Sequence, residues 1–321
     1  MDCMSPLLHL PPHPTFQCRE SKSNGSPILF ICNLPPGTNL EFATRSPSCG
    51  ALHENEQSAY QLENDDNEEE CCVDPNFFDA GYTMAGATGF TVWTGTRLLI
   101  EALCWSEGHQ CDRLKEIQCC ILNAKVIELG AGVGVVGTYL AACGGNVLLT
   151  DLPTLVDNAI DDNLQRNATI QPENGQSAPA WLGRSAFRIG KGWASSASLD
   201  WTLPIQDQLS SEQCKSVDII IASDVVFLVS MLQSLLDTVA SLFEESAANN
   251  PSFILSFQRR DSQDGEESTS FTTVNRVICE VKKRGWNMDC LAWRPVTVLK
   301  ERDSEVVKEE SQVFIFEIRP C

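Results

Sequence analysis

The sequence predicts an α/β fold: a doubly wound, mostly parallel sheet followed by an antiparallel C-terminal hairpin. Three observations lead to this prediction. Beyond Phe77, short apolar runs alternate with amphipathic helical stretches, a glycine-rich turn joins the first clear strand to a helix, and two β-rich runs close the chain. The alternation is typical of βαβ units, whose helices cover both faces of a parallel sheet.

Four apolar runs are expected to form parallel strands, because each is short and bounded by polar or turn-forming residues. They are residues 125–130, 146–150, 217–222 and 252–257. The stretch 217–236 has the length of a membrane span, but Asp218 and Asp224 lie inside it. We therefore expect a strand, a loop and a helix there.

Between the strands, apolar side chains recur at the spacing of helices that bury one face. The first predicted helix stops at Gly144-Gly145, and the second opens at Pro153, where a first-turn proline loses no hydrogen bond. Two further helices cover about 228–243 and 271–281. The last of them is closed by three basic residues and Gly285, a typical helix C-terminus.

The chain closes with two β-rich runs, residues 286–293 and 312–318, with no helical pattern between them. Runs without an intervening helix pair antiparallel. We expect a hairpin joined by the charged loop from Lys300 to Glu310, with the chain ending on the edge strand.

The N-terminal part differs in composition from the rest. Residues 1–53 mix proline, serine, cysteine and short apolar runs without a sustained period, and are expected to be poorly ordered. Residues 54–76 carry many acidic side chains and no basic one, which is typical of a solvated linker. The folded domain is expected to span residues 77–321.

Composition excludes several classes of partner. With 23 Lys and Arg against 43 Asp and Glu, the 321-residue chain has a formal net charge of −20. Such a surface repels phosphate backbones and anionic lipid, so we expect neither nucleic acid nor a membrane as a partner. The 15 cysteines contain no Cys-x-x-Cys pair, which predicts no metal site and the reduced thiols of a cytoplasmic protein. The Ser- and Pro-rich start leaves an organellar transit peptide open.

The glycine-rich turn lies where a strand is followed by a helix. Gly130, Gly132 and Gly134 allow the backbone to approach a ligand that a Cβ would repel. Two interpretations stay open: Gly132-x-Gly134-x-x-Gly137 satisfies the dinucleotide fingerprint, whereas the spacing from Gly130 suits a nucleoside without a phosphate. Asp151, at the end of the next strand, would hold a ribose in either case, or else cap the following helix.

Six sequence blocks in order make the stretch from Thr88 to about Phe271 resemble the seven-β-strand, S-adenosylmethionine-dependent lysine methyltransferases, methyltransferase family 16. The blocks are Thr91-Val-Trp93-Thr-Gly-Thr-Arg-Leu-Leu, Val126-Ile-Glu-Leu-Gly-Ala-Gly-Val-Gly-Val-Val-Gly137, Thr150-Asp-Leu-Pro153 with Asn158 and Asn163, Leu199-Asp-Trp201, Ala222-Ser-Asp-Val-Val-Phe227, and Ser256-Phe-Gln-Arg-Arg-Asp261. Residues 1–85 and much of 171–197 lie outside the resemblance.

The resemblance implies a Rossmann-like class I methyltransferase with a seven-stranded sheet. It also implies S-adenosyl-L-methionine as the cofactor and methylation of a lysine side chain in a protein substrate. We further expect a monomer.

The resemblance also implies the residues of the cofactor site. They are Trp93, Glu128, Gly130, Ala131, Gly132, Asp151, Trp201 and Ser223. Trp93 and Trp201 would be aromatic walls, which suit a sulfonium cation and an adenine alike. Asp151 would hold the ribose, Ser223 would offer a backbone contact, and the glycine turn would pass beneath the cofactor.

Asp224 begins the Asp-x-x-Tyr signature of the family and is predicted to be the catalytic residue. It would face the acceptor amine and orient it by accepting a hydrogen bond; the alternative is a cap for the next helix. Phe227 stands where the family usually has tyrosine, so the phenolic hydroxyl is missing. Either the acceptor pocket differs, or the activity is reduced or lost.

Two other classes of function stay open. The shifted glycine fingerprint would suit an NAD-type oxidoreductase, although no histidine follows position 109 and no Tyr-x-x-x-Lys follows the turn. The departure at Phe227 would suit a binding protein that keeps the fold and methylates nothing.

Overall fold

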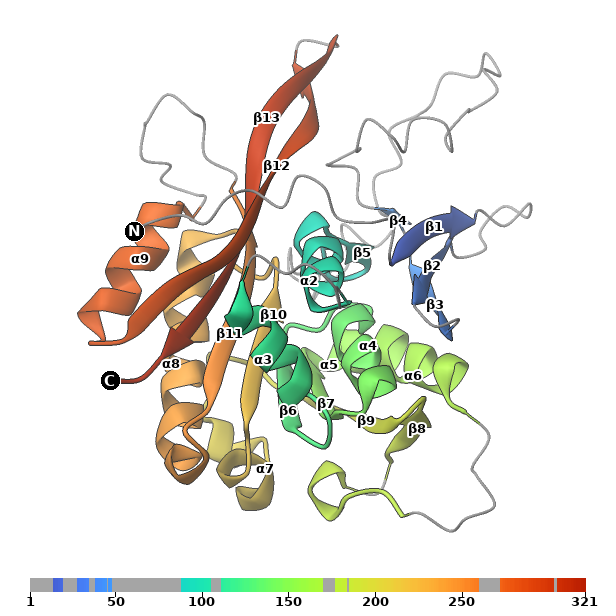
Figure 1. Ribbon diagram of the computed structural model, residues 1–321, viewed down its shortest axis with the longest axis vertical. Coiled ribbons are helices and arrows are strands. Elements are labelled where there is room, and N and C mark those ends of the chain that lie inside the picture. Colours follow the sequence, from blue (N-terminus) through green and yellow to red (C-terminus); the bar gives the residue numbers. More distant parts are fainter. Residues whose placement is uncertain are drawn as a thin grey trace.

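The computed structural model describes residues 14–19, 28–34, 38–44, 46–47, 88–104, 111–169, 177–183, 185–259, 272–302 and 305–321. At its centre is an eight-stranded sheet in the order β12-β13-β11-β10-β6-β7-β9-β8 (Figure 1). The strands are β6 (Lys125–Leu129), β7 (Asn146–Asp151), β8 (Phe187–Ile189), β9 (Gly192–Ser198), β10 (Ile219–Ser223), β11 (Ser252–Gln258), β12 (Asn287–Arg302) and β13 (Glu305–Arg319).

Five neighbouring strands, β11, β10, β6, β7 and β9, are parallel. The chain moves outward from β6 to β7 and β9 on one side, and through β10 to β11 on the other, so the strand order reverses between β6 and β10. Such a reversal leaves a crevice beyond the C-terminal ends of the two strands. The four predicted parallel strands are all present, and the predicted fold class is confirmed.

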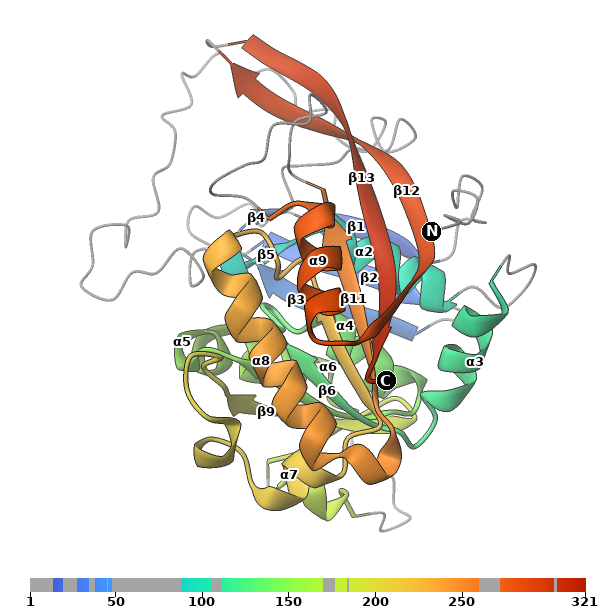
Figure 2. The same cartoon turned by 90° about the vertical axis from the view of Figure 1, so that its left-hand side faces the viewer.

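Helices cover both faces of the sheet (Figures 1 and 2). One face carries α2 (Thr94–Cys104), α3 (Asp112–Cys120), α4 (Val135–Cys143) and a helical run of α5 (Pro153–Leu155), the π-helix η1 (Val156–Ile160) and α6 (Asp161–Asn167). The other face carries α7 (Ser211–Lys215), α8 (Val229–Glu245) and α9 (Val274–Lys283). Short 3₁₀ turns are η2 (Ala180–Leu182), η3 (Ile205–Asp207) and η4 (Ala247–Asn249). Each face buries its own apolar cluster against the sheet.

The helix ends follow the expected turn chemistry. Pro153 occupies the first turn of α5, and Gly144 ends α4 in a left-handed conformation with φ +115°. After α9, Gly285 has φ +73°, and the N–H of Trp286 donates to the carbonyl of Val281 at 3.2 Å. This is the pairing of a glycine-terminated helix.

β12 and β13 form the predicted antiparallel hairpin, but two details of that prediction are wrong. The expected loop from Lys300 to Glu310 is largely strand, because pairing continues to Arg302 opposite Glu305. Pairing uses main-chain groups, so charged side chains alone do not end it. In addition, β13 lies between β11 and β12, so the edge strand is β12. The unbroken apolar run 313–316 is typical of a strand buried on both faces.

The sheet has eight strands where seven were predicted, because β8 adds a short antiparallel strand outside β9. β8 and most of β9 lie within the stretch 171–197, much of which is outside the resemblance. β9 reads Gly-Trp-Ala-Ser-Ser-Ala-Ser. Small residues of this kind carry little of the β-branched and aromatic signal that identifies strands.

Part of the segment expected to be poorly ordered forms a second, antiparallel sheet: β1 (Thr15–Arg19), β2 (Ile28–Leu34) and β3 (Thr38–Thr44). Its apolar side chains belong to the same buried cluster as α2 and α4, and they include Phe30, Cys32, Leu40 and Phe42. This burial against the helices gives the segment an order that its lack of periodicity did not indicate.

A short strand then leads from this sheet toward the main domain. β4 (Ser46–Pro47) pairs in parallel with β5 (Thr91–Val92), just ahead of α2. The acidic segment predicted at 54–76 lies outside the described residues.

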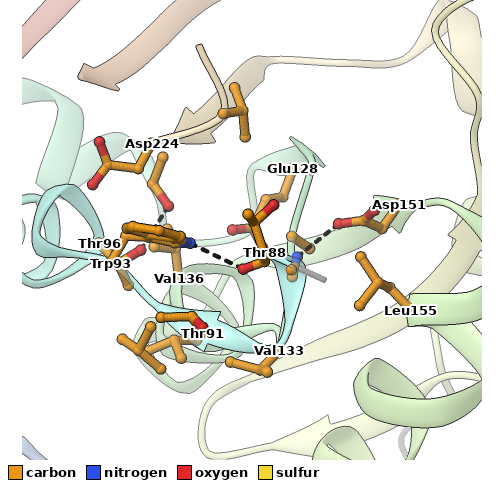
Figure 3. Close-up of a pocket in the computed structure, with 18 of the residues that line it drawn as sticks. Thr88, Thr91, Trp93, Thr96, Glu128, Val133, Val136, Asp151, Leu155 and Asp224 are labelled. Carbon is orange, nitrogen blue, oxygen red and sulfur yellow. Dashed lines mark hydrogen bonds between the residues drawn. The ribbon is translucent and has the colours of Figure 1, made fainter. Parts of the chain in front are cut away.

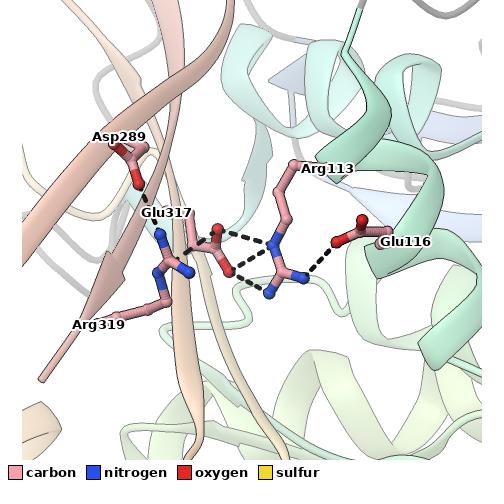
Figure 4. Close-up of polar contacts among 5 residues, drawn as sticks. All are labelled: Arg113, Glu116, Asp289, Glu317 and Arg319. Atoms are coloured by element: carbon pink, nitrogen blue, oxygen red, sulfur yellow. Dashed lines mark hydrogen bonds and ion pairs between the residues drawn. The ribbon is translucent and has the colours of Figure 1, made fainter.

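An ion pair between a partly exposed arginine and a buried glutamate ties α3 to the sheet (Figure 4). Glu317 on β13 is fully buried, and its carboxylate accepts from Nε and Nη2 of Arg113 at 2.9 and 2.7 Å. These hydrogen bonds raise the pKa of Arg113. Arg113 also donates to Glu116, and Arg319 lies 3.8 Å from Glu317 and donates to Asp289. Two-pronged pairing of this kind offsets the desolvation of the buried carboxylate.

Within the described part of the chain, no helix combines the length and apolar character that crossing a membrane requires. The stretch 217–236 contains β10 and the first turns of α8, as predicted.

Candidate functional site

A pocket opens where the strand order reverses, beyond the ends of β6 and β10 (Figure 3). It holds about 610 Å³ of empty space, part of which is open to solvent. All nine residues that the sequence placed at the site line this pocket: Trp93, Glu128, Gly130, Ala131, Gly132, Asp151, Trp201, Ser223 and Asp224. Asp151 and Asp224 lie at opposite sides of it (Figure 3).

In the turn after β6, two glycines lie so close to neighbouring groups that a side chain would not fit. Gly130 and Gly132 adopt left-handed conformations, with φ of +69° and +58°. A Cβ on Gly132 would lie 2.8 Å from the carbonyl oxygen of Gly89, and one on Gly130 would lie 2.6 Å from the side chain of Val225. Glycine is therefore required here for both conformation and space.

Glu128 is buried at the end of β6, with 1% of its surface exposed. Its Oε2 accepts the backbone N–H of Gly137 at 2.8 Å. Burial raises the pKa of Glu128 to about 8; the charge of Asp151 adds to this effect and the hydrogen bond from Gly137 opposes it. The carboxyl thus serves the first turn of α4 while lining the pocket.

Asp151 ends β7, and both of its carboxylate oxygens accept backbone N–H groups. Gly132 donates to Oδ2 at 2.8 Å and Leu152 donates to Oδ1 at 2.7 Å. The alternative role as a helix cap is not observed, because no side chain caps α5. Burial raises the pKa of Asp151 to about 6, against the effect of the two hydrogen bonds. A carboxylate has further lone pairs, so it can still accept hydroxyl groups.

The two predicted tryptophans form different parts of the pocket wall, and both are partly exposed. A Cβ on Gly130 would lie 3.2 and 3.3 Å from two ring carbons of Trp201, so this indole lies against the glycine turn. Trp93 follows β5, and its indole N–H donates to the carbonyl of Thr88 at 3.1 Å (Figure 3).

Asp224 follows β10 in a left-handed conformation, φ +55°, which residues other than glycine seldom adopt. Its Oδ2 accepts the N–H of Gly95 at 2.5 Å and its Oδ1 accepts that of Gln258 at 2.9 Å. The carboxylate therefore satisfies the N-terminus of α2, where the helix dipole favours a negative charge. It does not cap α8, whose N-cap is Leu228 without a side-chain bond.

Ser223 and Phe227 flank this aspartate and also line the pocket. The hydroxyl groups of Ser223 and Thr96 are 2.9 Å apart, a hydrogen bond that joins β10 to α2. Phe227 is partly exposed at the pocket.

Sequence reasoning missed the residues that give the pocket its shape. They include Thr88, Gly89, Thr91, Val133, Leu155, Val225 and Met231. A Cβ on Gly89 would lie 2.2 Å from a methyl group of Leu155, so this glycine too is fixed by packing. Thr91, Val133 and Val225 lie inside the sequence blocks that carry the resemblance, and Thr88 and Gly89 come a few residues before Trp93; these positions are the signals that could have indicated them.

The strand order, the glycine turn and the position of the pocket define a Rossmann-like class I methyltransferase fold. A family model described as lysine methyltransferase matches residues 82–182 and 188–276. The chain belongs to this lysine methyltransferase family, whose cofactor is S-adenosyl-L-methionine.

Curated relatives match over shorter stretches. EEF1A lysine methyltransferase 3 of Mus musculus is 40% identical over 74 residues, which are 23% of this chain and 32% of that protein. Protein-lysine methyltransferase METTL21E of Mus musculus is 25% identical over 174 residues, which are 51% of this chain and 62% of that protein. In both cases the chain covers less than two-thirds of the relative's own length.

A solved structure, magnesium protoporphyrin IX methyltransferase from Synechocystis with bound SAH, is similar at 13% identity and a TM-score of 0.41. The superposition covers 76% of this chain and 90% of that one.

Proposed function

We propose that this protein transfers a methyl group from S-adenosyl-L-methionine to a lysine side chain of a protein substrate. The observation that carries the proposal is the pocket, which gathers all nine predicted residues from five separate stretches of a chain of this family. The two tryptophans stay partly exposed within the pocket, so their rings are available to contact a ligand.

The residues of the pocket fit the cofactor. The turn at Gly130 and Gly132 has no room for side chains yet borders the pocket with bare backbone. Asp151 would accept hydrogen bonds from the ribose hydroxyls. The ring of Trp201 would give an apolar, π-rich wall beside that turn. When bound, S-adenosyl-L-methionine supplies a methyl group already activated by a sulfonium.

The acceptor amine would enter beside Asp224, on the side of the pocket away from Asp151 (Figure 3). The backbone N–H groups of Gly95 and Gln258 donate to the Asp224 carboxylate, and this carboxylate would orient the amine by accepting a hydrogen bond from it. Phe227 and Met231 would shield the amine from water, which lowers the pKa of a lysine and favours its nucleophilic form. Alignment of the reacting groups then supplies most of the rate increase.

A protein segment rich in basic residues is the substrate that the charge favours. The chain carries a net charge of −20, and opposite charge accelerates the encounter of two proteins.

Two measurements test the function. Calorimetry should show that S-adenosylhomocysteine binds and NADH does not; the reverse result would favour the oxidoreductase. Incubation with labelled S-adenosyl-L-methionine and a cell lysate should then label a protein band, whose modified residue should be a lysine. Binding without a labelled band would favour a protein that keeps the fold but methylates nothing.

We also propose a cytoplasmic location. It is supported by Cys32, Cys111 and Cys214, which are buried and form no disulfide. Unpaired buried thiols are typical of proteins in reducing compartments.

A further inference from the structure

Residues 88–93 form one wall of the pocket and lie between two layers. On the inner side, the carbonyl of Gly89 occupies the place that a Cβ on Gly132 would need. On the outer side, β4 pairs with Thr91 and Val92, and the hydroxyl of Thr44 donates to the carbonyl of Phe90 at 2.5 Å. The wall is therefore held between the N-terminal strands and the glycine turn.

Asn163 of α6 joins the same two layers through one side chain. It is fully buried. Its Oδ1 accepts the N–H of Ala43 at 2.8 Å, while its Nδ2 donates to the carbonyl of Ala43 at 3.2 Å and to that of Val133 at 2.9 Å. Ala43 belongs to β3 and Val133 to the glycine turn, so a single amide connects the N-terminal sheet to the pocket.

Asn167, one helical turn later, makes the same two-way contact with β3 but does not reach the glycine turn. Its Oδ1 accepts the N–H of Glu41 at 2.8 Å and its Nδ2 donates to the carbonyl of Glu41 at 2.7 Å. Its third hydrogen bond goes to the carbonyl of Asn163 within α6, and not to the turn. Together the two amides bond alternate residues of β3, as a neighbouring strand would. Asn167 thus docks the sheet without reaching the pocket.

We propose that the N-terminal sheet positions the cofactor pocket. Through Asn163 and Thr44, β3 holds the glycine turn and residues 88–93 in the geometry that binds S-adenosyl-L-methionine. Neither side chain lines the pocket, so both are positioning residues. The strands lie outside the stretches matched to the family, so this role is additional to the matched domain. The proposal rests on the proposed function only for the identity of the ligand.

The pair Asn163→Ala and Asn167→Ala provides a matched test. Each variant removes one two-way amide contact with β3, but only Asn163→Ala also removes the bond to Val133. We expect Asn163→Ala to weaken S-adenosylhomocysteine binding in calorimetry by about tenfold, the value of one buried hydrogen bond. Asn167→Ala should lower the unfolding temperature yet keep the affinity within about twofold of the wild type.

A second readout needs no ligand. Amide hydrogen exchange of residues 88–93 and 130–134 should accelerate in Asn163→Ala and stay unchanged in Asn167→Ala. If the wild-type protein binds no S-adenosylhomocysteine, the proposed function fails, while hydrogen exchange still decides the positioning role.

Thr44→Val covers the case in which Asn163→Ala does not fold, since it keeps the side-chain shape and removes only the hydroxyl bonded to Phe90. It should accelerate exchange in residues 88–93 and weaken binding. Equal effects of Asn163→Ala and Asn167→Ala on exchange and affinity would overturn the proposal. Unchanged hydrogen exchange in both Asn163→Ala and Thr44→Val would also overturn it. If Asn163→Ala does not fold, unchanged exchange in Thr44→Val alone would overturn it.

Discussion

Glu128 accepts the backbone N–H of Gly137 at 2.8 Å, and a Cβ on Gly137 would lie 2.5 Å from the same carboxylate oxygen. The absence of a side chain at Gly137 thus allows a buried acid to satisfy one of the N–H groups that the first turn of α4 leaves unpaired. The third glycine of the apparent dinucleotide fingerprint therefore serves Glu128. This agrees with the family assignment rather than with a dinucleotide site.

Glu128 should make the stability of the protein depend on pH. Its pKa is about 8 in the folded state, above the usual value of 4.5, so the folded state retains a proton that the unfolded state releases. The stabilisation is complete below about pH 4.5 and is lost as pH rises toward 8. Glu128→Gln keeps an acceptor for Gly137 and removes the titration. Its free energy of unfolding in urea should therefore exceed that of the wild type increasingly as pH rises.

The exposed Glu212 on α7 gives the control for losing one carboxyl group. Glu212→Gln should follow the wild-type pH profile. A Glu128→Gln profile parallel to that of the wild type would show that Glu128 does not titrate in this range.

Gly132→Ala should abolish cofactor binding. The new Cβ would lie 2.8 Å from the carbonyl oxygen of Gly89, and the residue would keep a φ of +58°. Gly285→Ala is the matched control, because Gly285 also has a positive φ, +73°, but no atom within 4 Å of its Cβ position. The control should cost about 1 kcal/mol of stability from backbone strain alone and retain S-adenosylhomocysteine binding. Retained binding in Gly132→Ala would contradict the packing argument.

Asp151 should make cofactor affinity depend on pH. Its pKa is about 6, and the ionised form is the one that accepts two hydroxyl hydrogen bonds. Affinity for S-adenosylhomocysteine in calorimetry should be constant above this pH and fall as pH decreases through about 6. Asp151→Asn should bind at least about tenfold more weakly, since it loses charge-assisted bonds, and its affinity should not follow this profile. A wild-type affinity that is constant through this range would argue against the ribose role.

Asp224→Asn should separate binding from methyl transfer. Asparagine tolerates the left-handed backbone of this position and keeps one acceptor, but its amide nitrogen cannot accept the second of the two backbone N–H groups. We expect S-adenosylhomocysteine affinity within about threefold of the wild type, and at least about a hundredfold loss of methylation of the lysate substrate. Methylation at the wild-type rate would remove the catalytic role of Asp224.

Arg113→Ala should destabilise the protein without changing the pocket. It leaves the buried Glu317 without its two-pronged partner, and the cost should be smaller than the roughly 3–5 kcal/mol typical of a fully buried pair, because Arg113 is partly exposed and Arg319 remains 3.8 Å from Glu317. Arg113→Leu combined with Glu317→Leu should recover most of this stability in urea unfolding, because no buried charge remains. The affinity for S-adenosylhomocysteine should be unchanged in both. A double variant as unstable as the single one would show that the pair itself stabilises the fold.

The regular part of the fold could be predicted because its strands and helices have clear periods. Leu155, Ala159, Ile160 and Leu164 follow one another at helical spacing after Pro153, and all four are buried. β9 escaped prediction because its serines and alanines give no strand signal, and its order comes from pairing with β7. The N-terminal sheet was not predicted because its apolar runs are short and pack against helices that lie far along the chain.

The candidate site could be predicted where chemistry requires a residue type, as with Asp151 and the glycines of the turn. The rest of the pocket depends on contacts between distant stretches. Examples are the close approach of Gly89 to the side chain of Leu155 and the hydrogen bond between the Asn163 amide and Ala43. Both depend on how distant segments pack, which local sequence patterns do not indicate.

Strands on both sides of the matched residues contribute to the fold, which has a practical consequence for anyone who shortens this protein. A fragment limited to residues 82–276 would end inside α9 and lack β12 and β13. Its β11 would present an open, apolar edge, which is a template for aggregation. Arg97 would also lose the rings of Phe16 and Phe30 that now lie against its guanidinium. Insolubility or inactivity of such a fragment would reflect missing structural support, and not a missing catalytic group.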